Sequence, residues 1–177
     1  KENKVFLAAT NNGNSRISED IKSKVVSKFT LLNVTNGISE ILRTQPEYLK
    51  LIIPIEENGS KNLTVLLYKE NISPNGFTLL TSGGMADKLG NDNDIVHYRG
   101  SIDNDAHSIA AITFSNSETM GLISNSDGNY VLGKIEKDVD GKFIIYNDRY
   151  LLPSSNFECA TNTDIPEINP PIKNPPV

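Results

Sequence analysis

Residues 96–147 decide the fold and read VHYRGSIDNDAHSIAAITFSNSETMGLISNSDGNYVLGKIEKDVDGKFIIYN. Five segments of this stretch have the composition of short β-strands. They lie at Val96–Arg99, Ser108–Phe114, Thr119–Ser124, Asn129–Ile135 and Lys142–Asn147. The separators are rich in Asp, Asn, Ser and Gly, which favour turns because their side chains or backbones suit tight chain reversals. The spacing therefore predicts consecutive antiparallel strands joined by short turns.

Upstream of this stretch, apolar side chains recur with a period of two from Tyr48 onward. Two such runs flank the turn Glu57-Asn58-Gly59-Ser60, and an Asn-Gly turn between alternating runs is a strong signal for a β-hairpin. One face of this hairpin is expected to be buried, and its apolar residues are Leu49, Leu51, Ile53, Leu63, Val65 and Leu67. A further strand is expected at Phe77–Thr81, followed by a loop rich in Gly, Asn and Asp at 83–94.

Two short helices are expected before the hairpin. In the first, Ser18 would cap the helix, with Glu19 and Asp20 in the first turn, where the helix dipole favours anions. The second is predicted at Ser39–Thr44 from the helical spacing of its apolar residues, and Pro46 ends it.

These elements predict a mostly β fold, either an antiparallel β-sandwich or a partly closed barrel, with one or two short helices. We expect one β domain over residues 1–159. Five prolines crowd the last 13 residues, which favours extended polyproline backbone, so residues 160–177 are expected to link to a following domain.

The composition of the chain argues against some kinds of binding partner. The chain has 17 Lys and Arg against 22 Asp and Glu, for a net charge of −5, and the charges are scattered. Nucleic-acid binding is disfavoured because phosphates select basic patches.

No apolar run approaches the roughly 18–20 residues that span a bilayer. Cys159 is the single cysteine of the chain, so an internal disulfide is excluded.

Several motifs in order resemble a known family. They begin with Tyr98-Arg99-Gly100, continue through the strand runs described above, and end with Tyr146-Asn147-Asp148-Arg149 and Phe157-Glu158-Cys159. Leu51-Ile52-Ile53-Pro54-Ile55 and Ile72-Ser73-Pro74 extend the likeness upstream. The series resembles the propeptide of secreted reprolysin-like (adamalysin-type) zinc metalloproteases, in the form found in bacterial multidomain enzymes. The likeness covers roughly residues 29–159.

The resemblance implies a role for Cys159. In that family a propeptide cysteine ligates the zinc of the protease domain and keeps the enzyme latent. A catalytic zinc holds three protein ligands and one open position, and a thiolate there would exclude the attacking water. The family often has Cys-Gly, whereas Ala160 follows here and lets the backbone approach the metal less closely. The alternative is that Cys159 is a buried small apolar residue.

Other residues suggest sites less specifically. His97 and His107 would need further ligands to hold zinc, and we interpret them as strand and turn residues. Asp92, Asp94, Asp103 and Asp105 lie in two Asp-Asn-Asp loops, where turn chemistry is favoured over calcium binding. The chain lacks His-Glu-x-x-His and Gly-x-Ser-x-Gly, so no hydrolase motif of these kinds is present.

The resemblance thus implies a non-catalytic segment that is secreted or lies at the cell surface. As the propeptide of a zinc metalloprotease, it would bind its own catalytic domain, hold it latent and assist its folding, with zinc in that domain and no cofactor of its own. The alternative is a β-sandwich module that binds carbohydrate or a cell surface, with no protease downstream. The presence or absence of His-Glu-x-x-His further along the reading frame would separate the two hypotheses.

Overall fold

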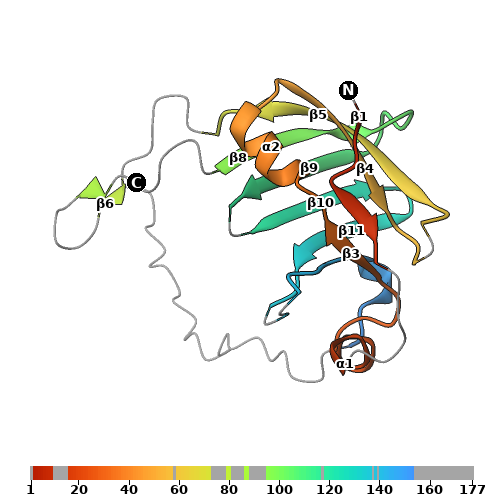
Figure 1. The fold of residues 1–177 in the computed structure, drawn as a ribbon. Helices are drawn as coiled ribbons and strands as arrows, with labels where there is room; N and C mark the ends of the chain where they lie inside the picture. Colours follow the sequence, from red (N-terminus) through yellow and green to blue (C-terminus); the bar gives the residue numbers. More distant parts are fainter. Residues whose placement is uncertain are drawn as a thin grey trace, which may run out of the picture.

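The computed structural model describes residues 2–9, 16–57, 59–72, 79–80, 86–87, 95–116, 118–136, 138 and 140–153. Its main feature is a ten-stranded sheet that curves into a nearly closed barrel (Figure 1). The strand order is β1-β4-β5-β8-β9-β10-β11-β12-β3-β2. All neighbours pair antiparallel except β1 and β4. The predicted mostly β, antiparallel architecture is confirmed, as a barrel.

The strands of this sheet are β1 (Glu2–Asn3), β2 (Phe6–Ala8), β3 (Thr30–Val34), β4 (Tyr48–Pro54), β5 (Asn62–Glu70), β8 (Ile95–Ile102), β9 (Ile109–Ser115), β10 (Thr119–Asn125), β11 (Gly128–Lys134) and β12 (Phe143–Asn147). A separate pair is formed by β6 (Leu79–Leu80) and β7 (Ala86–Asp87). The helical elements are α1 (Arg16–Lys24), α2 (Gly37–Thr44) and the 3-10 turn η1 (Asp148–Tyr150).

The strands predicted within residues 96–147 all form, with ends shifted by a few residues at most. They are β8 to β12, and each pairs antiparallel with the next along the chain. The predicted Asn-Gly hairpin is also confirmed, because every residue of β4 pairs with β5, from Tyr48 opposite Tyr68 to Pro54 opposite Asn62. Of the strand predicted at Phe77–Thr81, only Leu79–Leu80 lies within the described residues.

The N-terminal segment closes the barrel, and the sequence did not predict this. β1 adds to β4, while β2 pairs with β3 at the other edge of the sheet and also lies against β4. Val5 and Phe6 are completely or almost completely buried, and Phe6 packs on Phe143 with ring centroids 5.7 Å apart. Apolar burial on this segment therefore holds the two sheet edges together.

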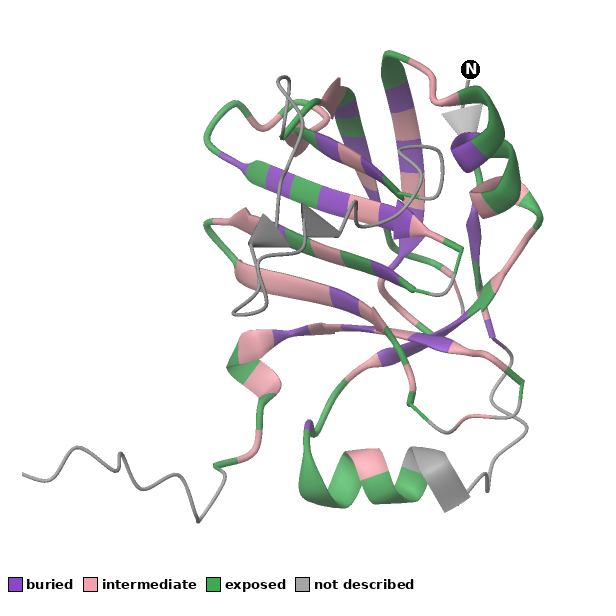
Figure 2. Ribbon diagram, turned by 90° about the vertical axis from the view of Figure 1, so that its left-hand side faces the viewer, coloured by how far each residue is buried: buried purple, intermediate pink, exposed green. Residues whose placement is uncertain are grey.

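The core fills the inside of the barrel. Buried and exposed residues alternate along the strands in Figure 2, as expected for a sheet with one buried face. The six hairpin residues predicted to share a buried face are each no more than 8% exposed: Leu49, Leu51, Ile53, Leu63, Val65 and Leu67. The predicted register is confirmed, since a slip of one residue would have turned them all outward.

The helices lie at opposite ends of the barrel (Figure 1). Ile41 and Leu42 of α2 join the barrel core, so α2 covers one end. The other helix begins at Arg16, before Ser18, so the expectation that Ser18 caps it is wrong. Val26, just after α1, is fully buried and bridges to Leu151.

Gly100 marks a close approach of two strands. A Cβ at this position would stand 1.8 Å from the carbonyl oxygen of Leu66 on β5 and 3.0 Å from the Cα of Leu67. Only glycine fits this spacing, because the obstructing atoms are backbone rather than movable side-chain ends. The structural reason for the glycine in Tyr98-Arg99-Gly100 is therefore the packing of β8 on β5.

Candidate functional site

A cluster of hydrogen bonds joins β11, β12 and η1 at the α1 end of the barrel. Asp148 accepts two hydrogen bonds from Asn129, one from its backbone N–H at 3.1 Å and one from its side-chain amide at 2.6 Å. Asn147 donates from Nδ2 to the carbonyl oxygen of Asp127 and accepts from the backbone N–H of Arg149, both at 3.1 Å. These bonds fix the direction in which the chain leaves the last strand.

Gly128 and the charged carboxyl group of Asp148 also belong to this cluster. Gly128 has a φ of +116°, and a Cβ there would stand 2.8 Å from Asn147 Oδ1. The side-chain hydrogen bond from Asn129, helped by its backbone N–H and by Arg149, holds the pKa of the Asp148 carboxyl below its ordinary value. The sequence motifs at 128–130 and 146–149 thus form one structural unit, although they lie on opposite sides of a turn.

The chain leaves the barrel along a short, fixed segment. The backbone N–H of Ser27 donates to the carbonyl oxygen of Tyr150, and the N–H of Leu152 donates to the carbonyl oxygen of Val25, each at 2.9 Å. With the bridge between Val26 and Leu151, these bonds tie the exit segment to the residues just after α1. The chain position at Pro153 is therefore held by the fold.

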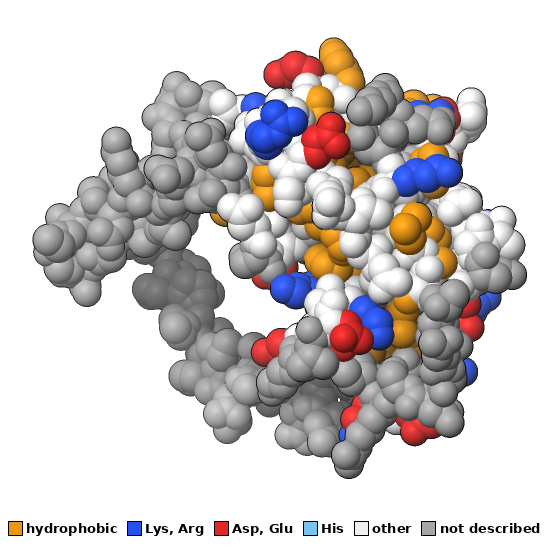
Figure 3. Space-filling view, viewed as in Figure 1, with side chains coloured by type: hydrophobic (Ala, Val, Ile, Leu, Met, Phe, Trp, Pro, Cys, Tyr) orange, Lys and Arg blue, Asp and Glu red, His pale blue; other side chains and the backbone are white. Residues whose placement is uncertain are grey.

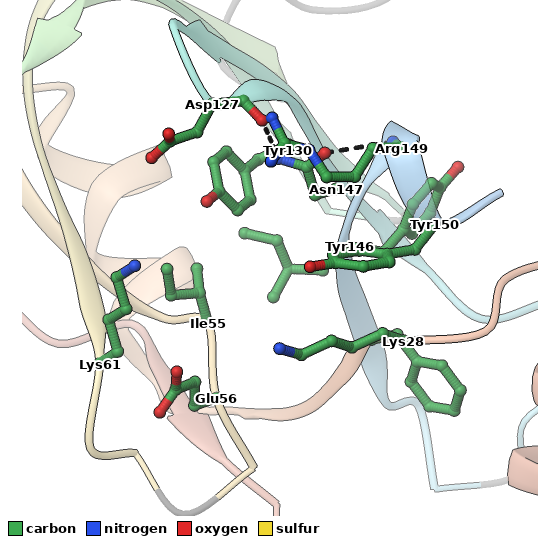
Figure 4. A pocket seen from close by; sticks show the side chains of 12 residues that line it. Lys28, Ile55, Glu56, Lys61, Asp127, Tyr130, Tyr146, Asn147, Arg149 and Tyr150 are labelled. Carbon is green, nitrogen blue, oxygen red and sulfur yellow. Dashed lines mark hydrogen bonds between the residues drawn. The ribbon is translucent and has the colours of Figure 1, made fainter.

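A pocket of about 250 Å³ opens at this end of the barrel (Figure 4). Its apolar lining includes Ile145, which is buried at 1% exposure, and Ile55. Charged side chains surround this apolar part and come from separate segments of the chain: Lys28, Glu56, Lys61, Asp127 and Arg149. Three tyrosines, at 130, 146 and 150, also line it. The ammonium group of Lys28 lies 5.5 Å from the centre of the Tyr150 ring, within cation–π range.

A second candidate surface lies on the outside of the barrel. We call it the outer row, and it consists of the register neighbours Tyr48, Tyr68, Arg99, Ala111, Leu122 and Val131. Tyr48 is 83% exposed, Tyr68 46% and Leu122 51%. Ile109 and Met120, which face outward beside the row, are also exposed. Exposed apolar residues that adjoin one another over several strands are typical of protein or ligand contact surfaces.

Charge does not mark a separate site. Figure 3 shows Lys and Arg side chains interspersed with Asp and Glu over the face that it presents. Across the described part of the chain, no three His, Cys, Asp or Glu side chains lie close enough together to hold a metal ion.

The structure places only some of the predicted site residues. Cys159, Asp92 and Asp94 lie outside the described residues, as does the predicted linker at 160–177. Asp105 forms turn bonds, since its carboxylate accepts from the His107 N–H and its carbonyl oxygen from the Ser108 hydroxyl.

The remaining candidates lie apart from the pocket and have ordinary structural contacts. Asp103 pairs with Lys50 at 3.4 Å. His97 lies on the outer face of β8, with Nδ1 2.9 Å from the hydroxyl of Thr113. His107 is exposed in the turn between β8 and β9. His97 therefore lies on a strand, and Asp103 and His107 lie in turns, as interpreted from the sequence.

The pocket residues were missed by the sequence interpretation. Lys28, Ile55, Lys61 and Tyr130 belong to different segments, and each has an ordinary local context. No short motif joins them, because the barrel itself brings them together. A signal that could have been used was the Asn-Gly turn, whose flanks supply Ile55 and Lys61.

Comparison with known proteins gives no identification. No protein family model, curated protein or solved structure matches this chain. Among the described helices, none is both long and apolar enough to cross a bilayer.

Proposed function

We propose that this chain is the propeptide of a secreted zinc metalloprotease of the reprolysin-like type, and that it holds the catalytic domain latent and assists its folding. The observation that carries the proposal is the order of the motifs along residues 97–159. The fold adds support, because the part of this series up to residue 149 lies on strands that follow one another from β8 to β12 and on η1.

The outer row supplies a surface with which such a domain can bind a partner. Its exposed apolar members lie on two pairs of adjacent strands: Tyr48 and Tyr68 on β4 and β5, and Ala111 and Leu122 on β9 and β10. Burial of apolar area is the main favourable term in protein association. An inhibitory domain of this kind needs no catalytic residues of its own. It needs a surface that complements the enzyme and a group that blocks the catalytic centre.

Cys159 is the blocking group in this proposal. It is the sixth residue after Pro153, where the fold fixes the exiting chain. At roughly 3.3–3.6 Å per residue, the extended reach is about 20 Å. Zinc in the catalytic domain would draw the thiol into its ionised form, and the thiolate would occupy the position that water needs for peptide hydrolysis.

The test uses this domain and the zinc protease domain encoded in the same reading frame. Added in trans, the parent chain should slow peptide hydrolysis. Cys159→Ser should weaken inhibition by about tenfold or more, because a hydroxyl is much harder to ionise than a thiol. Full inhibition by Cys159→Ser would refute the switch, and absence of a zinc protease domain from the reading frame would refute the propeptide itself.

A second pair of variants separates docking from zinc ligation. Leu122→Asp places a charge in the outer row and should weaken inhibition. Asn33→Asp is the matched control, since it adds the same charge at an exposed position on β3 outside the row. If the two variants inhibit equally, the outer row is not the docking surface.

The alternative function is carbohydrate binding, and one observation favours it. Tyr48 and Tyr68 are cross-strand partners on the outer face, and both rings are exposed. Exposed aromatic faces are suited to stacking on sugar rings. Oligosaccharide binding that is lost in Tyr48→Ala, in a chain with no protease domain downstream, would favour this alternative.

A further inference from the structure

We propose that the pocket at the α1 end of the barrel binds a carboxylate attached to an apolar group about the size of one amino-acid side chain. This site is independent of the proposed protease partner.

The position of the pocket makes one end of the barrel accessible. Ile41 and Leu42 of α2 fill the opposite end and belong to the core. At the α1 end, Ile145 is buried but lines the pocket, together with the half-buried Ile55 and Tyr130. An apolar group that enters here would meet the lower part of the barrel core rather than a flat surface.

The size of the pocket limits the ligand. Pockets for drug-sized molecules usually have volumes of roughly 300–1,000 Å³. A volume of about 250 Å³ is smaller, and it suits one short branched or aromatic group with a polar end.

The charges favour an anionic end. Figure 4 shows Lys28 and Lys61 on opposite sides of the pocket, with the Lys28 ammonium group directed into it and the Glu56 carboxylate drawn between the two lysines. Among the described residues, no carboxylate lies within salt-bridge distance of either ammonium group. Lys28 and Lys61 are also exposed, so either ammonium group can pair with a carboxylate without displacing an ion pair between described residues.

The two acidic side chains of the pocket act against an anion, and they sharpen the test. The carboxylate of Glu56 already accepts a hydrogen bond from the Ser60 hydroxyl. Asp127 is exposed and belongs to the β10–β11 turn. With Arg149 the pocket holds three cations against two carboxylates, which leaves a net positive charge.

The experiment is an NMR titration of the whole chain with three probes. N-acetyl-leucine carries an apolar side chain and a carboxylate like that of a peptide C-terminus, and isovalerate is a free aliphatic acid of similar width. N-acetyl-leucinamide matches the first probe without the negative charge. We expect the carboxylates to bind with a Kd of about 1 mM and to shift the signals of Ile55, Tyr130 and Ile145. Tighter binding of N-acetyl-leucine would identify a peptide terminus as the source, and tighter binding of isovalerate a free acid.

Charge variants give opposite expected signs. Lys28→Gln and Lys61→Gln should each weaken carboxylate binding by about threefold, whereas Asp127→Asn should strengthen it by about twofold. Arg43→Gln on α2 removes one positive charge at the other end of the barrel and should change nothing. Equal binding of the amide probe, equal effects of Lys61→Gln and Arg43→Gln, or no shift at Ile145 with any probe would overturn the proposal. Failure of protease inhibition would leave this result unchanged.

Discussion

Gly100→Ala tests the closest backbone approach in the barrel. The new Cβ would stand 1.8 Å from the Leu66 carbonyl oxygen, whereas ordinary van der Waals contact begins at about 3.4 Å, so β5 and β8 would have to separate by more than 1 Å. Overpacking usually costs about 1–3 kcal/mol. Because both obstructing groups are backbone atoms held in a strand ladder, we expect the upper end, about 3 kcal/mol, out of a total stability of roughly 5–15 kcal/mol.

The control is Gly133→Ala on β11, where no described atom lies within 4 Å of the position that a Cβ would take. Alanine there restricts the unfolded chain and should stabilise the fold by about 0.4–1 kcal/mol. Thermal unfolding followed by circular dichroism measures both changes. A loss of about 3 kcal/mol should lower the Tm by roughly 6–12 °C. Equal Tm values for the two variants would show that β5 and β8 do not approach as described.

Three further predictions concern the core and its polar partners. Val65→Asp should cost about 4 kcal/mol or more in urea unfolding because it buries a carboxylate without a partner, whereas Thr64→Asp on the outer face should cost much less. Burial raises the pKa of the Tyr98 hydroxyl to about 12. The stability that this shift contributes should therefore be complete below about pH 10 and be lost as pH rises toward 12. The Tyr98→Phe variant should lack this part of the alkaline pH dependence. The lowered pKa of Asp148 contributes stability above the ordinary aspartate pKa that is lost as pH falls through the folded-state value. Asp148→Asn, which removes the charged acceptor for Asn129, should therefore lower the Tm at neutral pH, with a smaller difference in acid. A constant difference at all pH values would contradict the last prediction.

The sequence predicts the β4–β5 hairpin and the consecutive strands β8 to β12 well, because the signals for them are local. Asp, Asn and Gly residues mark each turn, and the alternation from Leu49 to Leu67 identifies the buried face without knowledge of its partners. Closure of the barrel is different. Val5 and Phe6 lie in a short segment whose partners begin at Thr30 and Tyr48, and no local pattern shows which distant edges this segment joins. The sequence also places the start of α1 too late. Ser18 has a side chain suited to an N-cap, but it lies within the helix, which begins at Arg16.

The candidate sites likewise differ in how far the sequence alone can predict them. The motifs containing Asn129 and Asp148 could be recognised in the sequence, but their direct hydrogen bonds depend on the pairing of β11 with β12 and on the turn η1. The pocket depends still more on the fold, because Lys28 and Lys61 come from opposite walls of the barrel mouth. Neither lysine has an unusual sequence context. The pocket forms because the barrel closes and brings the two lysines to the same end.

The fixed exit segment sets a geometric condition on the proposed inhibition. Pro153 follows residues that are bound to Val25, Val26 and Ser27, so the chain begins its path to Cys159 from the α1 end of the barrel. A partner docked on the outer row must therefore present its zinc within about 20 Å of Pro153. Thiol ligation and docking are then coupled, since docking raises the effective concentration of the thiol at the metal. A weak outer-row contact and a single cysteine can thus inhibit together more strongly than either could alone.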